Sequence, residues 1–199
     1  MYIKQLQIVN TKDNILLREI NFHKGVNFIV DASDAANHNK VGKTTLLKLI
    51  DIIFGGNDKT SLYKDKELDT TNTELEAFIE GNKISATINL VDDLINPKHS
   101  HYITVDLFKK GTYKINGETL KKEDYKEKLN LFLFSNNSNI PTFRQSIKPF
   151  IRISLNQDNN QFLRFLNNGR NGIYRAIYNY LFNISDPSKD KRLFKTRIR

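Results

Sequence analysis

The tripeptide Gly42-Lys43-Thr44 constrains the fold of this chain more than any other feature, because of the segments on either side of it. Upstream, residues Val26 to Val30 form a short apolar run of the length expected of a buried central strand. Downstream, residues Leu46 to Phe54 are apolar on nearly every side and are followed by Gly55-Gly56, which predicts a buried helix with a glycine terminator. A strand, a polar loop and a helix in this order predict an α/β protein.

The polar loop before this helix matches the phosphate-binding pattern G-x-x-x-x-G-K-[ST] at every fixed position except the first, where Asn37 replaces glycine. Asn adopts left-handed backbone conformations more readily than other non-glycine residues, and backbone N–H groups hold the phosphates in such a loop. Lys43 is expected to reach the β- and γ-phosphates, and the Thr44 hydroxyl to bind Mg²⁺. The predicted nucleotide-binding residues are Asn37, Asn39, Lys40, Val41, Gly42, Lys43, Thr44 and Thr45. The alternative is a polar turn that only starts a helix.

The rest of the pattern predicts a strand-rich middle and a helical end. Alternating apolar residues predict a β-hairpin, and later segments predict further strands and helices. The hairpin is predicted at 1–9 and 15–22, the strands at 76–80, 83–91, 102–108 and 112–115 with a turn at Asn116-Gly117, and the helices at 123–134, 143–153, 161–167 and 173–184. We expect one domain over residues 1–185, followed by the start of a basic helix or coiled coil at 186–199.

Basic residues are concentrated near the C-terminus. The chain has a net charge of +9, and residues 141–199 hold 12 Lys and Arg against three acidic residues, while the charges of residues 1–140 cancel. This asymmetry predicts that the C-terminal third faces a polyanion such as DNA, or an acidic protein surface; a solvated basic end is the alternative. No apolar run is long enough for a membrane span or a signal peptide, so we expect a cytoplasmic protein.

The order of these segments resembles the N-terminal lobe of ABC-type ATPase heads in SMC, RecF and RecN proteins. The resemblance rests on residues Gly25 to Val30, on the loop Asn39 to Thr45 and on the apolar helix after it, and it extends loosely to Pro141 to Gln145. It implies a P-loop NTPase with a mixed sheet, additional antiparallel strands and a helical C-terminal third. It also implies ATP and Mg²⁺ as cofactors, with Lys43 as a catalytic residue.

The resemblance further implies a Q-loop glutamine that contacts Mg²⁺ and the attacking water. Gln145 is the predicted residue, as a catalytic residue and a Mg²⁺ ligand, and Gln157 and Gln161 are alternatives. An ordinary polar side chain is the simpler interpretation of each. Heads of this kind sandwich ATP as dimers and act on or near DNA, which implies a head-to-head dimer and a role in DNA repair or phage defence.

The chain departs from the family pattern in three motifs. It has no Leu-Ser-Gly-Gly-type signature motif, no apolar strand ending in the Asp-Glu pair of a Walker B motif, and no switch histidine. In the family these elements follow a long coiled coil, so we expect this chain to be the N-terminal part of a head that needs a separate C-terminal lobe. Alone, it should bind nucleotide poorly and hydrolyse it slowly or not at all, because Mg²⁺ would lack an acidic partner and the attacking water a general base.

Two other functions are compatible with parts of this pattern. The main alternative is a non-catalytic module, in which nucleotide only orders the fold and the basic C-terminal third docks a protein partner. A small P-loop kinase or GTPase is disfavoured by the antiparallel strands predicted from Glu76 to Ile115 and by the absence of an Asn-Lys-x-Asp motif.

Overall fold

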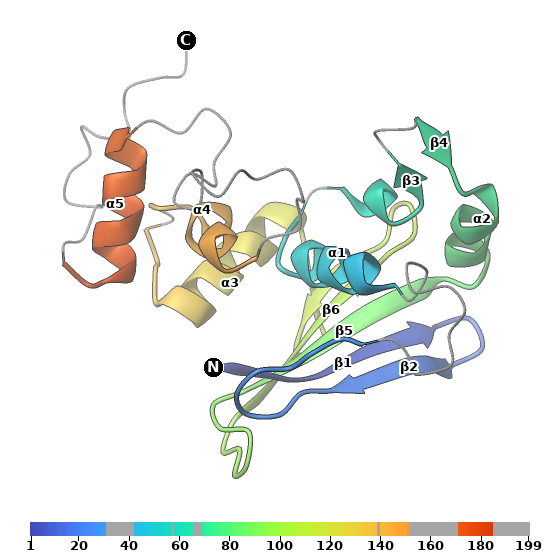
Figure 1. Ribbon diagram of the computed structural model, residues 1–199, viewed down its shortest axis with the longest axis horizontal. Coiled ribbons are helices and arrows are strands. Elements are labelled where there is room, and N and C mark those ends of the chain that lie inside the picture. The colour runs from blue at the N-terminus through green and yellow to red at the C-terminus, as the bar shows by residue number, and fades with distance from the viewer. Residues whose placement is uncertain (31–41, 57, 66–68, 139, 152–170, 185–199) are drawn as a thin grey trace. The chain divides into compact units, whose positions relative to one another are not determined.

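An antiparallel sheet is the largest element of the computed structural model, which describes residues 1–30, 42–56, 58–65, 69–138, 140–151 and 171–184 (Figure 1). The chain divides into two compact units, Met1–Tyr125 and Lys126–Arg199. The first unit contains β1 (Tyr2–Asn10), β2 (Ile15–Asn21), α1 (Lys43–Ile53), the 3₁₀ helix η2 (Lys59–Leu62), β3 (Lys64–Asp65), β4 (Thr70–Thr71), α2 (Thr73–Gly81), β5 (Ile84–Val91), β6 (Ser100–Asp106), β7 (Tyr113–Ile115), β8 (Glu118–Leu120) and the first turn of α3 (Lys122–Phe134).

The sheet has the strand order β2-β1-β5-β6-β7-β8, and every pair of neighbours is antiparallel. One buried row crosses four strands in register, because each of its residues is paired directly with the next. The row consists of Leu6, Ile88, Ile103 and Ile115. This row forms the floor of the core of the first unit. The parallel strands of the expected mixed sheet are not among the described elements.

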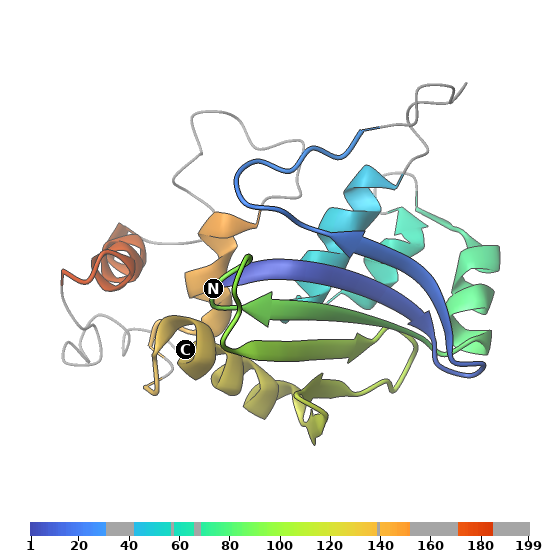
Figure 2. The same cartoon turned by 90° about the horizontal axis from the view of Figure 1, so that it is seen from below.

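Helices cover the apolar face of this sheet. Helix α1 contacts β5 and β6, and α2 contacts β5, on the same side of the strands (Figures 1 and 2). The opposite face of the sheet is turned toward the viewer in Figure 2. It carries polar side chains that pair across neighbouring strands. Gln5 Nε2 donates to Asn21 Oδ1 (2.8 Å), Gln7 Nε2 donates to Glu19 Oε2 (2.9 Å), and the hydroxyls of Thr87 and Thr104 are 2.9 Å apart. An antiparallel sheet with one buried and one polar face is stable in this arrangement.

Several sequence predictions are confirmed at the level of single elements. The hairpin forms as β1 and β2, and the strands predicted at 83–91, 102–108 and 112–115 form as β5, β6 and β7. The turn between β7 and β8 has positive φ at both Asn116 (51°) and Gly117 (83°), as a two-residue type I′ hairpin loop requires. Helix α1 ends at Ile53, and Gly55 follows with a φ of 77°, as the glycine terminator predicted.

The prediction of a strand at 76–80 is wrong, because these residues lie within helix α2. Asn72 caps this helix: its side-chain oxygen accepts a hydrogen bond from the Leu75 backbone N–H at 2.9 Å. Glu74 and Glu76 lie in the first turn, where the positive end of the helix dipole stabilises acidic side chains. The cap and these charges outweigh the short apolar run that suggested a strand.

The second unit is helical in its described residues and includes the rest of α3, followed by α4 (Phe143–Ile147), the 3₁₀ helix η3 (Lys148–Phe150) and α5 (Asn171–Leu181). The ring of Phe134 in α3 lies 6.0 Å from that of Phe143 and 6.4 Å from that of Phe150. The Tyr180 hydroxyl of α5 donates to the Phe134 carbonyl at 2.6 Å. The end of the helix predicted at 143–153 and the whole of that at 161–167 lie outside the described residues, as does the basic helix at 186–199. The predicted extent of the domain, 1–185, stays a prediction.

None of the helices in the described part of the chain is long and apolar enough to cross a lipid bilayer.

The turn after α1 gives a test of the packing that fixes this helix. A Cβ atom at Gly56 would lie 2.6 Å from Asp51 Oδ2 and 2.8 Å from the Asp51 carbonyl oxygen, whereas a Cβ at Gly81, the last residue of α2, meets nothing within 4 Å. Gly56→Ala should therefore destabilise the protein by about 1–3 kcal/mol. Gly81→Ala should be neutral or stabilise it by up to about 1 kcal/mol. Urea unfolding followed by circular dichroism measures both, and equal effects would contradict the proposed packing.

Candidate functional site

The amino end of α1 is the region that the sequence marks as a phosphate site. Gly42 is the N-cap residue and has the left-handed conformation φ 75°, ψ 16°. The Gly42 carbonyl accepts the first helical hydrogen bond, from the Leu46 N–H at 2.9 Å. A residue with a Cβ is strained at this φ, so the glycine of the Gly-Lys-Thr motif serves to turn the chain into the helix.

The first turn of α1 has the chemistry of an anion-binding site. It contains no acidic residue, and Gly42 provides no side-chain cap, so the positive end of the helix dipole is not neutralised by its own first turn. Thr44 is exposed, Thr45 is half-buried and Leu46 is buried, so the polar end faces solvent while the next residue enters the core. These residues fit a phosphate group with a bound Mg²⁺, for which the Thr44 hydroxyl is the available ligand.

Part of the predicted site lies outside the described residues, namely Asn37, Asn39, Lys40, Val41 and the side chain of Lys43. The structure therefore brings together Gly42, Thr44 and Thr45 at one helix end. The described residues contain no group of three or more His, Asp or Glu side chains placed to hold a metal ion. A Mg²⁺ site here would depend on Thr44 and on the phosphates themselves.

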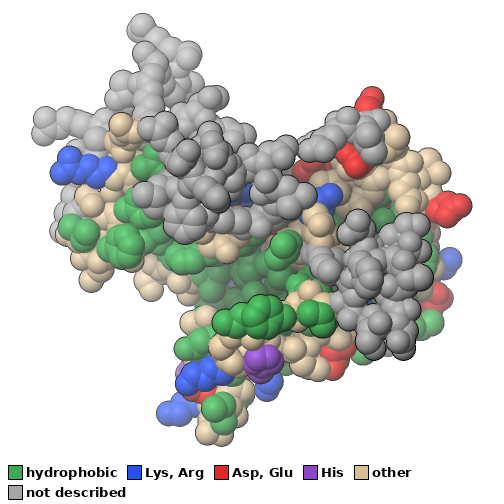
Figure 3. Space-filling model, viewed as in Figure 1, with side chains coloured by type: hydrophobic (Ala, Val, Ile, Leu, Met, Phe, Trp, Pro, Cys, Tyr) green, Lys and Arg blue, Asp and Glu red, His purple; other side chains and the backbone are tan. Residues whose placement is uncertain are grey.

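The segment upstream of the loop differs from its prediction. Residues 26–30 were expected to form a buried strand, but they form no strand and are exposed: Val26 is 69%, Phe28 82% and Val30 75% accessible. Apolar side chains accordingly gather on the surface over the segment that follows β2 (Figure 3). The prediction is wrong for a physical reason: a central strand is buried only when strands pair with it on both sides, and the described residues supply none.

Local hydrogen bonds nevertheless hold the start of this exposed segment. The Asn27 side-chain oxygen accepts from the His23 N–H at 3.0 Å, and its amide donates back to the His23 carbonyl at 2.9 Å. Gly25 lies inside this loop with a φ of 93°. The chain is thus turned back beside β2, the edge strand of the sheet, before it reaches residue 30 (Figure 2).

The carboxyl half of α1 is held by contacts that the sequence did not reveal. Lys48 Nζ donates to the Ser61 carbonyl at 2.7 Å, which joins α1 to η2. Lys59 Nζ in turn donates to the Asp106 carbonyl at 2.5 Å and lies 4.7 Å from the centre of the Tyr113 ring. Burial lowers the pKa of Lys59 below its usual value, and the charge of Asp106 partly opposes this shift. Such contacts join residues far apart in sequence, so periodicity and motifs give no signal for them.

Gln145, the predicted Q-loop residue, has a structural role in α4 of the second unit. Its side-chain oxygen accepts from the Thr142 N–H at 2.9 Å, and its own N–H donates to the Thr142 hydroxyl at 3.4 Å. The two residues form a capping box at the start of α4. A role of Gln145 at Mg²⁺ stays a prediction, and it would require this cap to open. The alternatives Gln157 and Gln161 lie outside the described residues.

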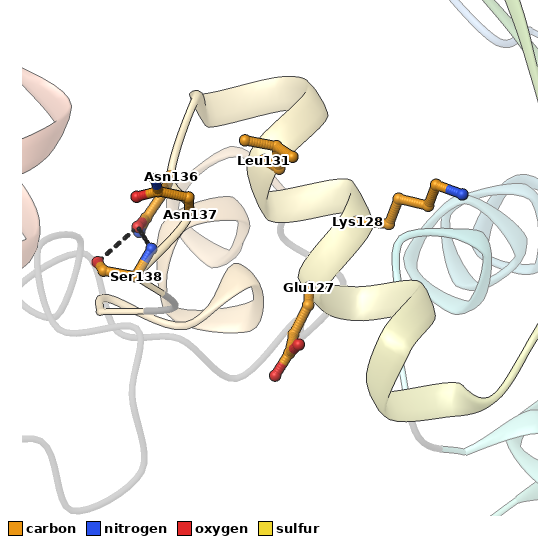
Figure 4. Close-up of a pocket in the computed structure, with 6 residues that line it drawn as sticks. All are labelled: Glu127, Lys128, Leu131, Asn136, Asn137 and Ser138. Atoms are coloured by element: carbon orange, nitrogen blue, oxygen red, sulfur yellow. Dashed lines mark hydrogen bonds between the residues drawn. The ribbon is translucent and has the colours of Figure 1, made fainter.

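A hollow of about 340 Å³ in the second unit offers no comparable chemistry. Its lining residues are Glu127, Lys128, Leu131, Asn136, Asn137 and Ser138 (Figure 4). The Asn136 side-chain oxygen accepts from both the N–H (3.1 Å) and the hydroxyl (2.8 Å) of Ser138, so it is used within the turn. Lys128 points away from this turn (Figure 4). We assign no ligand to this hollow.

Comparison with known proteins supports the fold but not an identity. The sequence matches no family model and no curated protein. Among solved structures, the chain is similar to an SMC ATPase studied for its ATP-driven dimerization and DNA-stimulated activation, with a TM-score of 0.51 and 16% sequence identity. The similarity covers 91% of this chain and 99% of that one. The protein therefore has an α/β fold that resembles an SMC ATPase head in its overall course.

The capping box allows the structural role of Gln145 to be separated from a metal-binding role. Gln145→Ala should destabilise α4 by about 0.5–2 kcal/mol, as Thr142→Ala should, because each removes half of the box. Gln145→Glu should be as stable as the wild type, since glutamate makes the same cap. Thermal unfolding measures these differences. A destabilised Glu variant would argue against the cap, and the Q-loop role requires that this variant also alters the Mg²⁺ dependence of nucleotide binding.

Proposed function

We propose that this chain is the ATP-binding N-terminal part of an SMC/RecN-like ATPase head. The observation that carries the proposal is the Gly-Lys-Thr motif at a left-handed N-cap, at the start of a helix whose other side is buried on an antiparallel sheet. The fold, which is similar to that of an SMC ATPase, is compatible with this proposal. The module alternative remains the second candidate.

In this proposal the residues at the start of α1 hold the nucleotide. The N–H groups at residues 42–45 and the dipole of α1 would hold the phosphates, Lys43 would reach their outer oxygens, and Thr44 would bind Mg²⁺. Bound Mg²⁺ would neutralise charge on the phosphates. Hydrolysis also needs an acidic Mg²⁺ partner and a general base, and the Walker B pair that would supply them does not occur in this sequence.

A second segment would complete the head. We place its contact with this chain at residues 26–30, which have the composition of a central strand but are exposed. A strand supplied by a C-terminal lobe, on this or another polypeptide, would bury Phe28 and Val30 and satisfy the backbone beside them. Heads of two such assemblies would then sandwich ATP as a dimer.

DNA is the partner that we propose for the basic C-terminal third. Within its described residues, the basic side chains are Lys148 and Arg175, together with Arg144. Contacts of Lys and Arg with phosphates are independent of base sequence and weaken steeply with salt. Following the resemblance to SMC and RecN proteins, we propose that the protein acts on or near DNA, in repair or in defence against phage.

The ATP site is tested by Lys43→Ala. Loss of one charged hydrogen bond costs about 1.5–3 kcal/mol, so the affinity for Mg²⁺-ATP should fall about 10- to 150-fold. Isothermal titration at high protein concentration measures it, with Lys12→Ala, in the exposed β1–β2 turn, as the matched control. An unchanged affinity would overturn the proposal. In the complete protein, loss of ATP-dependent activity supports the head, whereas partner binding that survives without it supports the module.

The contact with a second lobe is tested by Phe28→Ser. Phe28 is 82% exposed, so its replacement should change the stability of this chain by less than about 0.5 kcal/mol. The variant should nevertheless bind the segment that carries the signature and Walker B motifs much more weakly, as measured by co-purification and titration. Ile95→Ser, at a residue that is 74% exposed elsewhere on the first unit, is the control. Equal binding by both variants would move the contact away from residues 26–30.

A further inference from the structure

The last turn of α1 depends on one hydrogen bond from a distant helix. A helix leaves its last four carbonyl groups without partners in the next turn, and buried carbonyls need a donor. The chain just after α1 supplies three backbone donors: Phe54 to Ile50 (3.0 Å), Gly55 to Ile52 (3.0 Å) and Gly56 to Asp51 (2.8 Å). The remaining carbonyl, that of Ile53, accepts from the hydroxyl of Tyr125 in α3, 72 residues along the chain.

The environment of Tyr125 holds this donor in place and favours its protonated form. Its side chain is fully buried, and its ring packs at 5.0 Å, centre to centre, against that of Tyr113. Burial raises the pKa of Tyr125 well above its usual value, which favours the protonated hydroxyl as the donor. The Tyr113 ring also contacts Lys59 of η2, which is bonded to β6. The hydroxyl is therefore held in place by a packed cluster.

Tyr125 also occupies a special position in the chain. The two compact units divide between Tyr125 and Lys126, inside the continuous helix α3. The first turn of α3 thus belongs to the unit with the candidate ATP site, and its remainder belongs to the helical unit. That remainder carries contacts of the second unit, because Asn130 donates to the Pro141 carbonyl at 3.0 Å and Phe134 accepts from Tyr180.

We propose that Tyr125 is a positioning residue through which nucleotide at the amino end of α1 regulates the order of α3. The inference rests on the proposed function and adds a regulatory output to that site. Helix α1 has 11 residues and acts as a rigid rod about 16 Å long, with phosphate at one end and Tyr125 at the other. A ligand that restricts α1 restricts Ile53, and the hydrogen bond passes this restriction to α3. By linkage, an ordered α3 tightens nucleotide binding by the same factor.

Hydrogen exchange of the chain with and without Mg²⁺-ATPγS tests this coupling. In the wild type, nucleotide should slow exchange at least twofold both at 43–53 and at 126–134. In Tyr125→Phe, which keeps the ring and removes only the donor, protection should persist at 43–53 and be lost at 126–134. Tyr102→Phe, at an exposed tyrosine of β6, should behave like the wild type. Without nucleotide, Tyr125→Phe should speed exchange at 50–56 and at 126–134 together.

The outcomes separate this inference from the proposed function. If nucleotide leaves exchange at 43–53 unchanged in the wild type, the proposed function fails and this inference falls with it. If 43–53 is protected and 126–134 is not, only the inference is overturned, and this result needs no variant. Faster exchange at only one end in nucleotide-free Tyr125→Phe also overturns it, because the bond would then not couple the end of α1 to α3.

Discussion

Burial of one side of α1 on the antiparallel sheet is the interaction on which the candidate site depends. Helices of this length are marginal in water, so the packing of Leu46, Leu49 and Ile52 against the sheet, more than local propensity, holds α1 in place. Each fully buried side chain of this kind contributes about 1.5–3 kcal/mol. The core therefore sets the direction of the helix dipole, so the orientation of the proposed phosphate site depends on residues that lie away from it.

The sequence correctly predicted the elements that are defined by their own periodicity or turn residues. The predictions failed where contacts with residues distant in the sequence decide the structure. The β1–β2 hairpin, the Asn116-Gly117 turn and α1 with its glycine stop each carry their own periodicity or turn chemistry. Residues 26–30 carry the pattern of a strand, but burial depends on neighbouring strands that the described residues do not contain. The prediction of a strand at 76–80 did not take account of Asn72, whose side chain caps the start of α2.

The site was predictable in the same uneven way. The Gly-Lys-Thr motif correctly placed Gly42 and Thr44 at the start of a helix, because the motif itself encodes the turn. The resemblance predicts a catalytic role for Gln145, and the structure gives this residue a capping role that a Thr-x-x-Gln pattern could have signalled. The hydrogen bonds made by Lys48, Lys59 and Tyr125 join residues that are 13, 47 and 72 positions apart in the sequence. No pattern in one sequence identifies such pairs.

The exposed run from Val26 to Val30 has a consequence for how the protein can exist in a cell. Extended apolar segments that lack a neighbouring strand are templates for unintended pairing between molecules. If the covering segment of the proposed assembly belongs to another polypeptide, this chain made in excess of that segment would precipitate or be degraded. The supply of the two polypeptides must then be matched, and the ratio at which they are synthesised becomes a property under selection, as much as the residues proposed to hold ATP.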